Sequence, residues 1–263
     1  NNIKLKLLEK YSSKEIFNHS FEYNKNIEDK ILNCKKLNLD KYFNYLEKYN
    51  IKVINFKDER YPKLLNSIEN KPAFLYIRGN LENLYSDNLA IVGSRNASEY
   101  GKCVARKISK ELADKNINIV SGLALGIDKY AHIGALDSMY GKTIAVLGTG
   151  VSDSEVYPLQ NKKIFERILE SNGTIISEFR LGTKPEKYNF PLRNRIISGI
   201  SKKVIVVEAT ENSGSLITAN YALEQGKDIY AVLGNITSKN SIGTNKLIEE
   251  GAYILKSIED IFY

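Results

Sequence analysis

The sequence predicts an α/β protein built on a doubly wound, mostly parallel β-sheet. From Leu89 onward, short apolar segments alternate with segments whose apolar residues recur at helical spacing. Glycines recur just after the apolar segments, where a parallel strand meets its loop. The chain has 263 residues, 43% of them hydrophobic, which is enough to bury such a sheet.

The expected elements follow in order along the chain. Residues 1–50 are polar with apolar positions at helical spacing, which predicts a small helical N-terminal region. Residues 51–88 form a lead-in with strands at 51–54 and 73–77, interrupted at Tyr61-Pro62 and Lys71-Pro72. Residues 89–263 form the core. Its strands are expected at 89–92, 117–120, 143–147, 174–177, 204–207, 229–233 and 252–255.

Composition sets broad limits on function. Lys and Arg number 38 against 31 Asp and Glu, and the formal charge of +7 suits a polyanion partner as well as an ordinary solvated surface. No apolar stretch is long enough to span a bilayer, and no signal-peptide pattern opens the chain. Cys34 and Cys103 lack metal-ligand spacing, and His19 and His132 lie far apart. We expect a cytoplasmic protein without a metal site or membrane contact.

The segment Ala90–Arg95 predicts an anion site. An apolar strand ends at Gly93 and presents Ser94 and Arg95 just before a helix, for which Ser98 is the expected N-cap. Backbone amides at a helix N-terminus favour phosphate, and Arg95 adds a guanidinium of matching geometry. We expect that phosphate to belong to a nucleotide or to a nucleic-acid backbone.

Two common nucleotide-binding motifs are absent from the sequence. No G-x-G-x-x-G follows the first core strand, and G-x-x-x-x-G-K-S/T does not occur. A conventional NAD-dependent enzyme or P-loop ATPase is therefore disfavoured. Several glycines after strands instead predict a ligand that approaches the backbone closely at the carboxyl edge of the sheet.

Asp128 and His132 raise the question of acid–base catalysis. They are four residues apart, on one face of the helix predicted after the loop 121–126. A carboxylate near a helix start and a locally hydrogen-bonded histidine are the favoured interpretation, because no nucleophile lies nearby in the sequence. We therefore expect no catalytic site.

A second cationic segment, Phe190–Arg195, begins another predicted helix, with Pro191 suited to its first turn. Its two guanidiniums, Arg193 and Arg195, either contact a phosphate or base, or pair internally with Glu178 or Glu208 and brace the sheet edge. Both interpretations stay open for each arginine, and we expect one arginine in each role.

Two further loops offer contacts to a ligand. Ser213, Gly214 and Ser215 follow the strand 204–207 and form either an anion nest or an ordinary helix cap. Tyr157 lies in a loop that ends in amide side chains, and its ring either stacks on a base or packs internally.

Taken together, these segments resemble the DNA-processing protein A family, also called Smf. The resemblance covers residues from about 55 to 263. It is carried by GSR at 93–95, SGLALGID at 121–128, AH at 131–132, YP at 157–158, SE at 177–178, FPLRNRIISGIS at 190–201, VVEA at 206–209, SGSLIT at 213–218 and GA at 251–252.

The resemblance implies an extended Rossmann-like domain at 51–263 that binds single-stranded DNA, without a cofactor and without catalysis. It further implies a homodimer that protects incoming DNA in natural transformation and loads the RecA recombinase onto it. Arg95 is then the principal phosphate ligand. The implied neighbours are Gly93, Ser94, Gly122, Gly126, Tyr157, Asn161, Phe190, Arg193, Asn194, Ser213, Gly214 and Ser215.

The chain departs from the family pattern in several places. Leu159 and Gln160 follow Tyr157-Pro158, where the family commonly has a DNA-contacting lysine, and Lys162 or Lys163 would have to substitute. Leu233 precedes Gly234 where a proline is usual. Many members end with a small winged-helix module, whereas this sequence stops at Tyr263, so we expect either a shorter form of the family or a chain cut before that module. Residues 1–50 do not clearly match the helical module found in some members.

Two alternatives remain. Related Rossmann-like domains include nucleotide-binding sensors and hydrolases with a Pro-Gly-Gly phosphate loop before a Gly-Thr pair. Gly243-Thr244 occurs here without that loop, which disfavours a hydrolase. An interaction scaffold with a vestigial pocket would follow if Leu159 abolishes DNA affinity.

Overall fold

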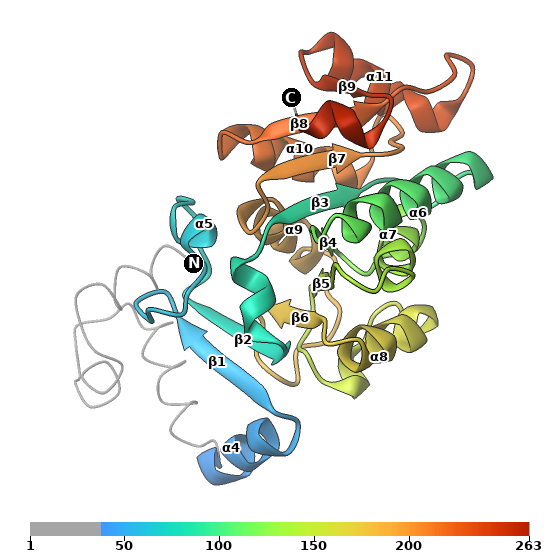
Figure 1. Ribbon diagram of the computed structural model, residues 1–263. Coiled ribbons are helices and arrows are strands. Elements are labelled where there is room, and N and C mark those ends of the chain that lie inside the picture. Colours follow the sequence, from blue (N-terminus) through green and yellow to red (C-terminus); the bar gives the residue numbers. More distant parts are fainter. Residues whose placement is uncertain (1–37, 263) are drawn as a thin grey trace.

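The computed structural model describes residues 38–262 and contains one nine-stranded sheet with helices on both faces (Figure 1). The strands are β1 (Ile51–Asn55), β2 (Phe74–Gly79), β3 (Asn88–Val92), β4 (Asn118–Ser121), β5 (Thr143–Val146), β6 (Thr174–Ser177), β7 (Lys203–Val206), β8 (Asp228–Val232) and β9 (Tyr253–Leu255). The predicted fold class is confirmed.

The helices alternate with the core strands. The α-helices are α4 (Leu39–Lys48), α5 (Lys63–Asn66), α6 (Glu99–Asp114), α7 (Ile127–Leu136), α8 (Lys162–Glu170), α9 (Asn189–Gly199), α10 (Gly214–Glu224) and α11 (Ile242–Glu249). The 3-10 turns are η1 (Leu81–Tyr85), η2 (Asp153–Glu155), η3 (Leu159–Asn161), η4 (Lys239–Ser241) and η5 (Ile258–Ile261). Helix α4 lies in the predicted N-terminal helical region, and residues 1–37 of that region lie outside the described part of the chain.

The strand order is β1-β2-β6-β5-β4-β3-β7-β8-β9. All neighbours from β6 to β9 pair in parallel, whereas β2 pairs antiparallel with both β1 and β6. The chain winds outward from β3 to β6, returns through α9, and then winds the other way from β7 to β9. The winding therefore reverses between β3 and β7, and open α/β sheets bind ligands beyond the carboxyl ends of strands at such a reversal.

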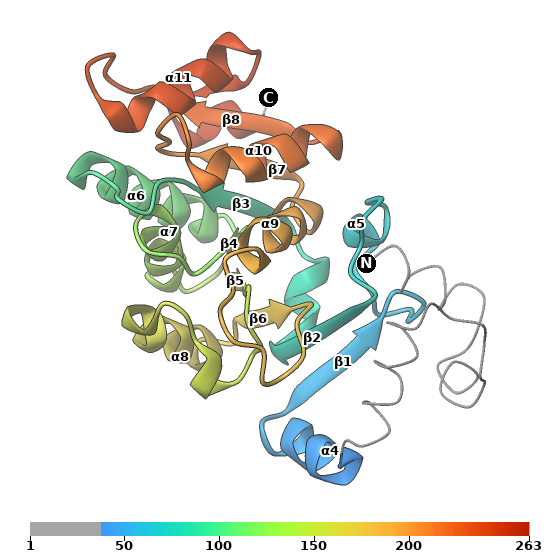
Figure 2. The same cartoon turned by 180° about the vertical axis from the view of Figure 1, so that it is seen from behind.

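Alternate residues of the buried strands pack into separate hydrophobic clusters on the two faces of the sheet. Ala90 and Val92 pack with α9 and α10, whereas Leu89 and Ile91 pack with α6 and α7 on the other face. Figures 1 and 2 show these two helical layers from opposite sides of the sheet. Because both faces are covered, the strands are continuous apolar runs, and such runs are recognisable in sequence.

Helix α6 begins and packs as its sequence predicts. The Ser98 side chain accepts a hydrogen bond from the Gly101 amide (3.0 Å), which caps the helix. Ala105, Ile108 and Leu112 are buried on one face, at the spacing that directs them to the sheet. The cap fixes where the β3–α6 loop ends, and Arg95 lies in that loop. No helix within residues 38–262 is long and apolar enough to cross a membrane.

Candidate nucleic-acid interface

A cleft of about 530 Å³ lies where the winding of the sheet reverses. Its walls are the loop after β3, the loop after β7, the first turns of α9 and α10, and the turn η4. Most of the residues expected to contact a ligand line this cleft. They are Gly93, Ser94, Arg95, Phe190, Arg193, Asn194, Ser213, Gly214 and Ser215.

Arg95 extends into the cleft from a firmly held loop. The Ser94 amide donates to the Glu208 carbonyl (2.7 Å), and the Asn96 amide donates to Ser94 Oγ (3.2 Å). The Arg95 side chain is exposed, and within residues 38–262 it forms no ion pair. Its guanidinium donors are therefore available to an anion.

An aromatic platform lies beside this guanidinium. The Arg95 Cζ atom lies 5.6 Å from the centre of the Phe190 ring. Tyr157 is 47% exposed, and the centre of its ring lies 5.5 Å from that of Phe190 with the planes 39° apart. Arg95, Tyr157 and Phe190 line a small depression together with Gly122 and Arg193. One guanidinium and two partly accessible rings thus lie together, a combination suited to the phosphate and the flat base of an unpaired nucleotide.

Arg193 is buried and holds two loops together. Its Nη1 donates to the Gly122 carbonyl (2.6 Å) and to the carbonyl of Val146, and its Nε donates to Asn194 Oδ1 (3.2 Å). Burial lowers the pKa of Arg193 to about 10, although the nearby Asp128 carboxylate acts in the opposite direction. The guanidinium remains charged at neutral pH, so it contributes positive potential to the cleft while its Nη1 donates to the backbone.

Arg195 has the bracing role. Its two terminal nitrogens donate to the two carboxylate oxygens of Glu178 (2.6 and 2.8 Å), and its Nε donates to the Asn70 carbonyl (2.8 Å). Glu208, the other expected partner, instead accepts from the Ser98 amide (2.9 Å) and hydroxyl. Of the two interpretations that the sequence left open for Arg195, the structure shows the internal ion pair with Glu178.

Asp128 and His132 hold the loop that follows β4. Asp128 Oδ2 accepts from the amides of Gly122 (3.1 Å) and Ala124 (3.4 Å), and His132 Nε2 accepts from the Leu123 amide (3.3 Å). Burial lowers the pKa of His132 to about 3, and burial raises the pKa of Asp128 against the opposing effect of Arg193. The neutral histidine can accept the hydrogen bond from the Leu123 amide. This geometry agrees with the interpretation that Asp128 and His132 are structural residues with local hydrogen bonds.

Asn161 and Gly126 shape the walls without lining the cleft. The buried Asn161 side chain donates from Nδ2 to the carbonyls of Leu123 (2.9 Å) and Ala124 (3.0 Å). Gly126 has φ +73°, and a Cβ there would lie 2.2 Å from the Ser94 carbonyl oxygen. Asn161 therefore holds the β4–α7 loop to the turn η3, and Gly126 allows the same loop to pack against the loop that carries Arg95.

Gly122 is required because the Arg193 guanidinium lies against it. A Cβ at Gly122 would lie 2.5 Å from Arg193 Nη2. The sequence predicted that Gly122 lets a ligand approach the backbone. In the structure, it is the buried Arg193 side chain that approaches the backbone there. Ser213 likewise caps α10, and the Asn194 side chain donates to the Gly214 carbonyl (3.1 Å).

The sequence interpretation missed one wall of the cleft. Lys239 and Asn240 of η4 line it, as do Asn96, Thr210 and Asn212. The available clue was position: Lys239 and Asn240 lie in the loop after the predicted strand 229–233, at the same carboxyl edge as the other loops.

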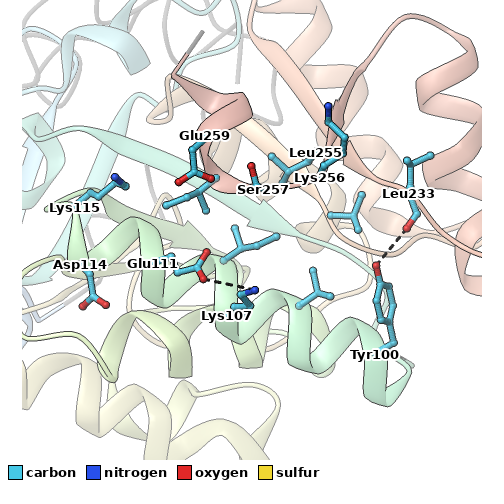
Figure 3. A pocket seen from close by; sticks show the side chains of 14 residues that line it. Tyr100, Lys107, Glu111, Asp114, Lys115, Leu233, Leu255, Lys256, Ser257 and Glu259 are labelled. Carbon is cyan, nitrogen blue, oxygen red and sulfur yellow. Dashed lines mark hydrogen bonds and ion pairs between the residues drawn. The ribbon is translucent and has the colours of Figure 1, made fainter.

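A second groove, of about 600 Å³, runs between α6 and the β8–β9 edge (Figure 3). Its charged lining balances three cations, Lys107, Lys115 and Lys256, against three anions, Glu111, Asp114 and Glu259. Lys107 is moreover paired with Glu111 at 3.8 Å. This groove is larger than the cleft but lacks an excess of positive charge, so it is the poorer match to a polyanion.

Known proteins are similar in sequence to this chain over most of its length. A family model described as DNA recombination-mediator protein A matches residues 52–263. Protein Smf of Escherichia coli (strain K12) is 43% identical over 217 residues, which are 82% of this chain and 57% of that protein. DNA processing protein DprA of Bacillus subtilis (strain 168) is 42% identical over 213 residues, 81% of this chain and 70% of that protein. The chain thus spans little more than half of the E. coli relative.

Solved structures of similar proteins share the fold. The X-ray structure of DNA processing protein A from Streptococcus pneumoniae has a TM-score of 0.77 and 38% identity, covering 89% of this chain and 84% of that one. A structure of the Helicobacter pylori protein has a TM-score of 0.72 and 30% identity, covering 81% of this chain and 94% of that one. The reported subject of the latter is the single-stranded DNA binding mode of that protein.

Proposed function

Because this chain belongs to the DNA recombination-mediator protein A family, we propose that it binds single-stranded DNA in the cleft between β3 and β7. The Helicobacter pylori relative, described by its single-stranded DNA binding mode, supports this ligand class. We assign the DNA-binding domain to residues 51–263. No catalytic step, metal or cofactor is part of the proposal.

The observation that carries this proposal is the exposed Arg95 guanidinium beside the rings of Phe190 and Tyr157. A guanidinium binds a backbone phosphate in a bidentate geometry. An aromatic ring stacks on any base, so it favours bases that are not already stacked in a duplex. These two contacts together suit an unpaired strand of any sequence.

The role in the cell follows from the family. We propose that the protein acts in the cytoplasm as a homodimer, protects incoming single strands during natural transformation and loads the RecA recombinase onto them. The family's description as a recombination mediator supports this role.

Titration of a labelled oligo-dT tests the binding step. The affinity should exceed that for a duplex of equal length, and mononucleotides should bind weakly and without turnover. Raising salt from about 50 to 200 mM should weaken binding, with a log–log slope of about 0.7 for each phosphate neutralised.

The other outcomes are distinguishable. Tight mononucleotide binding with hydrolysis would replace the proposal with a nucleotide-processing enzyme. Absence of any nucleic-acid affinity would leave an interaction scaffold. The loading step is tested separately, by whether the protein accelerates RecA assembly on strands already coated with a single-strand-binding protein.

A further inference from the structure

The cleft contains a second accessible cation, Lys239, in the turn between β8 and α11. Three cations line the cleft, namely Arg95, Arg193 and Lys239. The Nη1 and Nε donors of Arg193 are directed to backbone carbonyls and to Asn194, and this residue is buried. Lys239 is exposed, and within residues 38–262 it forms no ion pair. Among the described residues of this lining, Arg95 and Lys239 are therefore the two exposed cations, and both can reach a phosphate.

Asn240 fixes the turn that carries Lys239. Its Nδ2 donates to the Asn96 carbonyl (2.9 Å), and its own carbonyl accepts from the Ala209 amide (2.8 Å). Asn96 follows Arg95 directly in the chain. A side-chain bridge thus joins the loop of Arg95 to the turn of Lys239, although the two segments are 144 residues apart.

We propose that Lys239 is a second phosphate ligand of the cleft and that Asn240 is the residue that positions it. The inference rests on the proposed single-stranded DNA binding and names a contact within the same site. A polynucleotide carries one phosphate per nucleotide, so two cations on adjoining walls hold two phosphates of one strand. Mononucleotides have a single such group and gain from one contact only.

Lys239→Ala tests the contact in the full chain. Its dissociation constant for oligo-dT should rise about tenfold at low salt, and its salt slope should be smaller by about 0.7, the loss of one phosphate contact. Lys239→Arg should keep the wild-type slope, because the charge remains. The matched control is Lys246→Ala, since Lys246 is an exposed lysine of α11 that pairs with Glu250 (3.7 Å) and does not line the cleft.

Asn240→Ala tests the positioning role. It should weaken oligo-dT binding in the wild-type background and have no further effect in the Lys239→Ala background, because it acts through that lysine. Equal losses in the two backgrounds would overturn the positioning role, since they would indicate a separate contact or a general loss of structure.

The two proposals fail in different ways. If the wild type binds oligo-dT and Arg95→Ala weakens it, but Lys239→Ala changes neither affinity nor slope, then only the Lys239 inference is wrong. If the wild type does not bind oligo-dT, both are wrong. If Lys239→Ala weakens binding but leaves the salt slope unchanged, the proposed contact between Lys239 and a phosphate is also wrong.

Discussion

The β3–α6 loop and helix α9 use the same type of side chain in opposite ways. In the β3–α6 loop, Arg95 is exposed, lies near the ring of Phe190 and forms no ion pair within residues 38–262. In α9, Arg195 is 3% exposed and directs its donors to both oxygens of Glu178 and to two backbone carbonyls. A guanidinium whose donors are all used inside the protein stabilises the fold, whereas one with free donors is available to a ligand. The difference lies in the partners and not in the residue type.

Arg193 lies between these extremes. Its Nη1 and Nε donors are used internally, like the donors of Arg195, yet it lines the cleft, and within residues 38–262 it forms no ion pair with a carboxylate. It therefore contributes potential to the site rather than a direct contact. Substitution of Arg195 should therefore affect mainly stability, and substitution of Arg95 should affect mainly binding, with Arg193 between them.

The largest effect is expected for Arg195→Ala. Removing one partner of a buried ion pair leaves the Glu178 carboxylate without its main counter-charge, so the free energy of unfolding should fall by about 3–5 kcal/mol. Urea denaturation followed by circular dichroism measures this loss. The control is Arg106→Ala, which removes an exposed arginine from an ion pair with Asp137 (2.7 Å) and should cost less than about 1 kcal/mol. Equal losses would remove the distinction drawn between the two arginine settings.

Arg95→Ala should give the opposite pattern. The free energy of unfolding should change by no more than about 0.5 kcal/mol, because the side chain is exposed and forms no ion pair with any residue that the structure describes. The affinity for oligo-dT should fall by about 10- to 100-fold, the range of one charged hydrogen-bonded contact. Fluorescence anisotropy at fixed salt provides the measurement, with Arg106→Ala as the control for loss of a surface charge. Unchanged affinity would exclude Arg95 as the principal phosphate ligand.

The sequence predicted the sheet well because its strands are buried on both faces. The expected strand 174–177 has the observed bounds, and the expected strand 204–207 is observed at Lys203–Val206. Continuous apolar runs followed by glycines carry this information locally. The antiparallel attachment of β2 to β6 is different, since it joins Tyr76 to Ser177 across a long stretch of chain. No local pattern specifies that pairing.

The site was predictable in its location but not in the roles of its side chains. Parallel strands place the loops after them at one edge, so Arg95, Phe190 and Ser213 were expected together and all line the cleft. Which arginine faces a carboxylate depends on where Glu178 lies after folding. Lys239 was missed for a similar reason, because its place beside the Arg95 loop depends on the bond from Asn240 to Asn96.

The pH dependence of stability tests the wall built by the β4–α7 loop. His132 titrates near 6.5 in the unfolded chain and near 3 in the folded one, so the unfolded state binds more protons between these values. Stability should therefore fall as the pH falls from about 6.5 towards 3, with a contribution from His132 of about 2 kcal/mol between pH 6 and pH 4. His132→Gln should lack this contribution while keeping an oxygen to accept the Leu123 amide.

Urea denaturation of both proteins at several pH values isolates the histidine. Carboxylates such as Asp128 titrate in both proteins, so the difference between the two stability curves reports His132. If the two curves of stability against pH are parallel, burial does not keep His132 neutral. The hydrogen bond from the Leu123 amide would then not depend on a neutral His132.

The smallest effect is expected for the aromatic platform. Tyr157 is half-exposed and lies beside Phe190, so Tyr157→Ala removes part of a stacking surface and should weaken oligo-dT binding by about fivefold, the low end for base stacking. Tyr157→Phe keeps the ring and should bind like the wild type. Tyr140→Ala, which removes an exposed tyrosine that does not line the cleft, controls for loss of surface aromatic area. If Phe and Ala at this position weaken binding equally, the hydroxyl rather than the ring makes the contact. The Tyr157 hydroxyl would then bind the strand as a polar group beside Arg95, and the preference for unpaired bases would depend on stacking by the Phe190 ring.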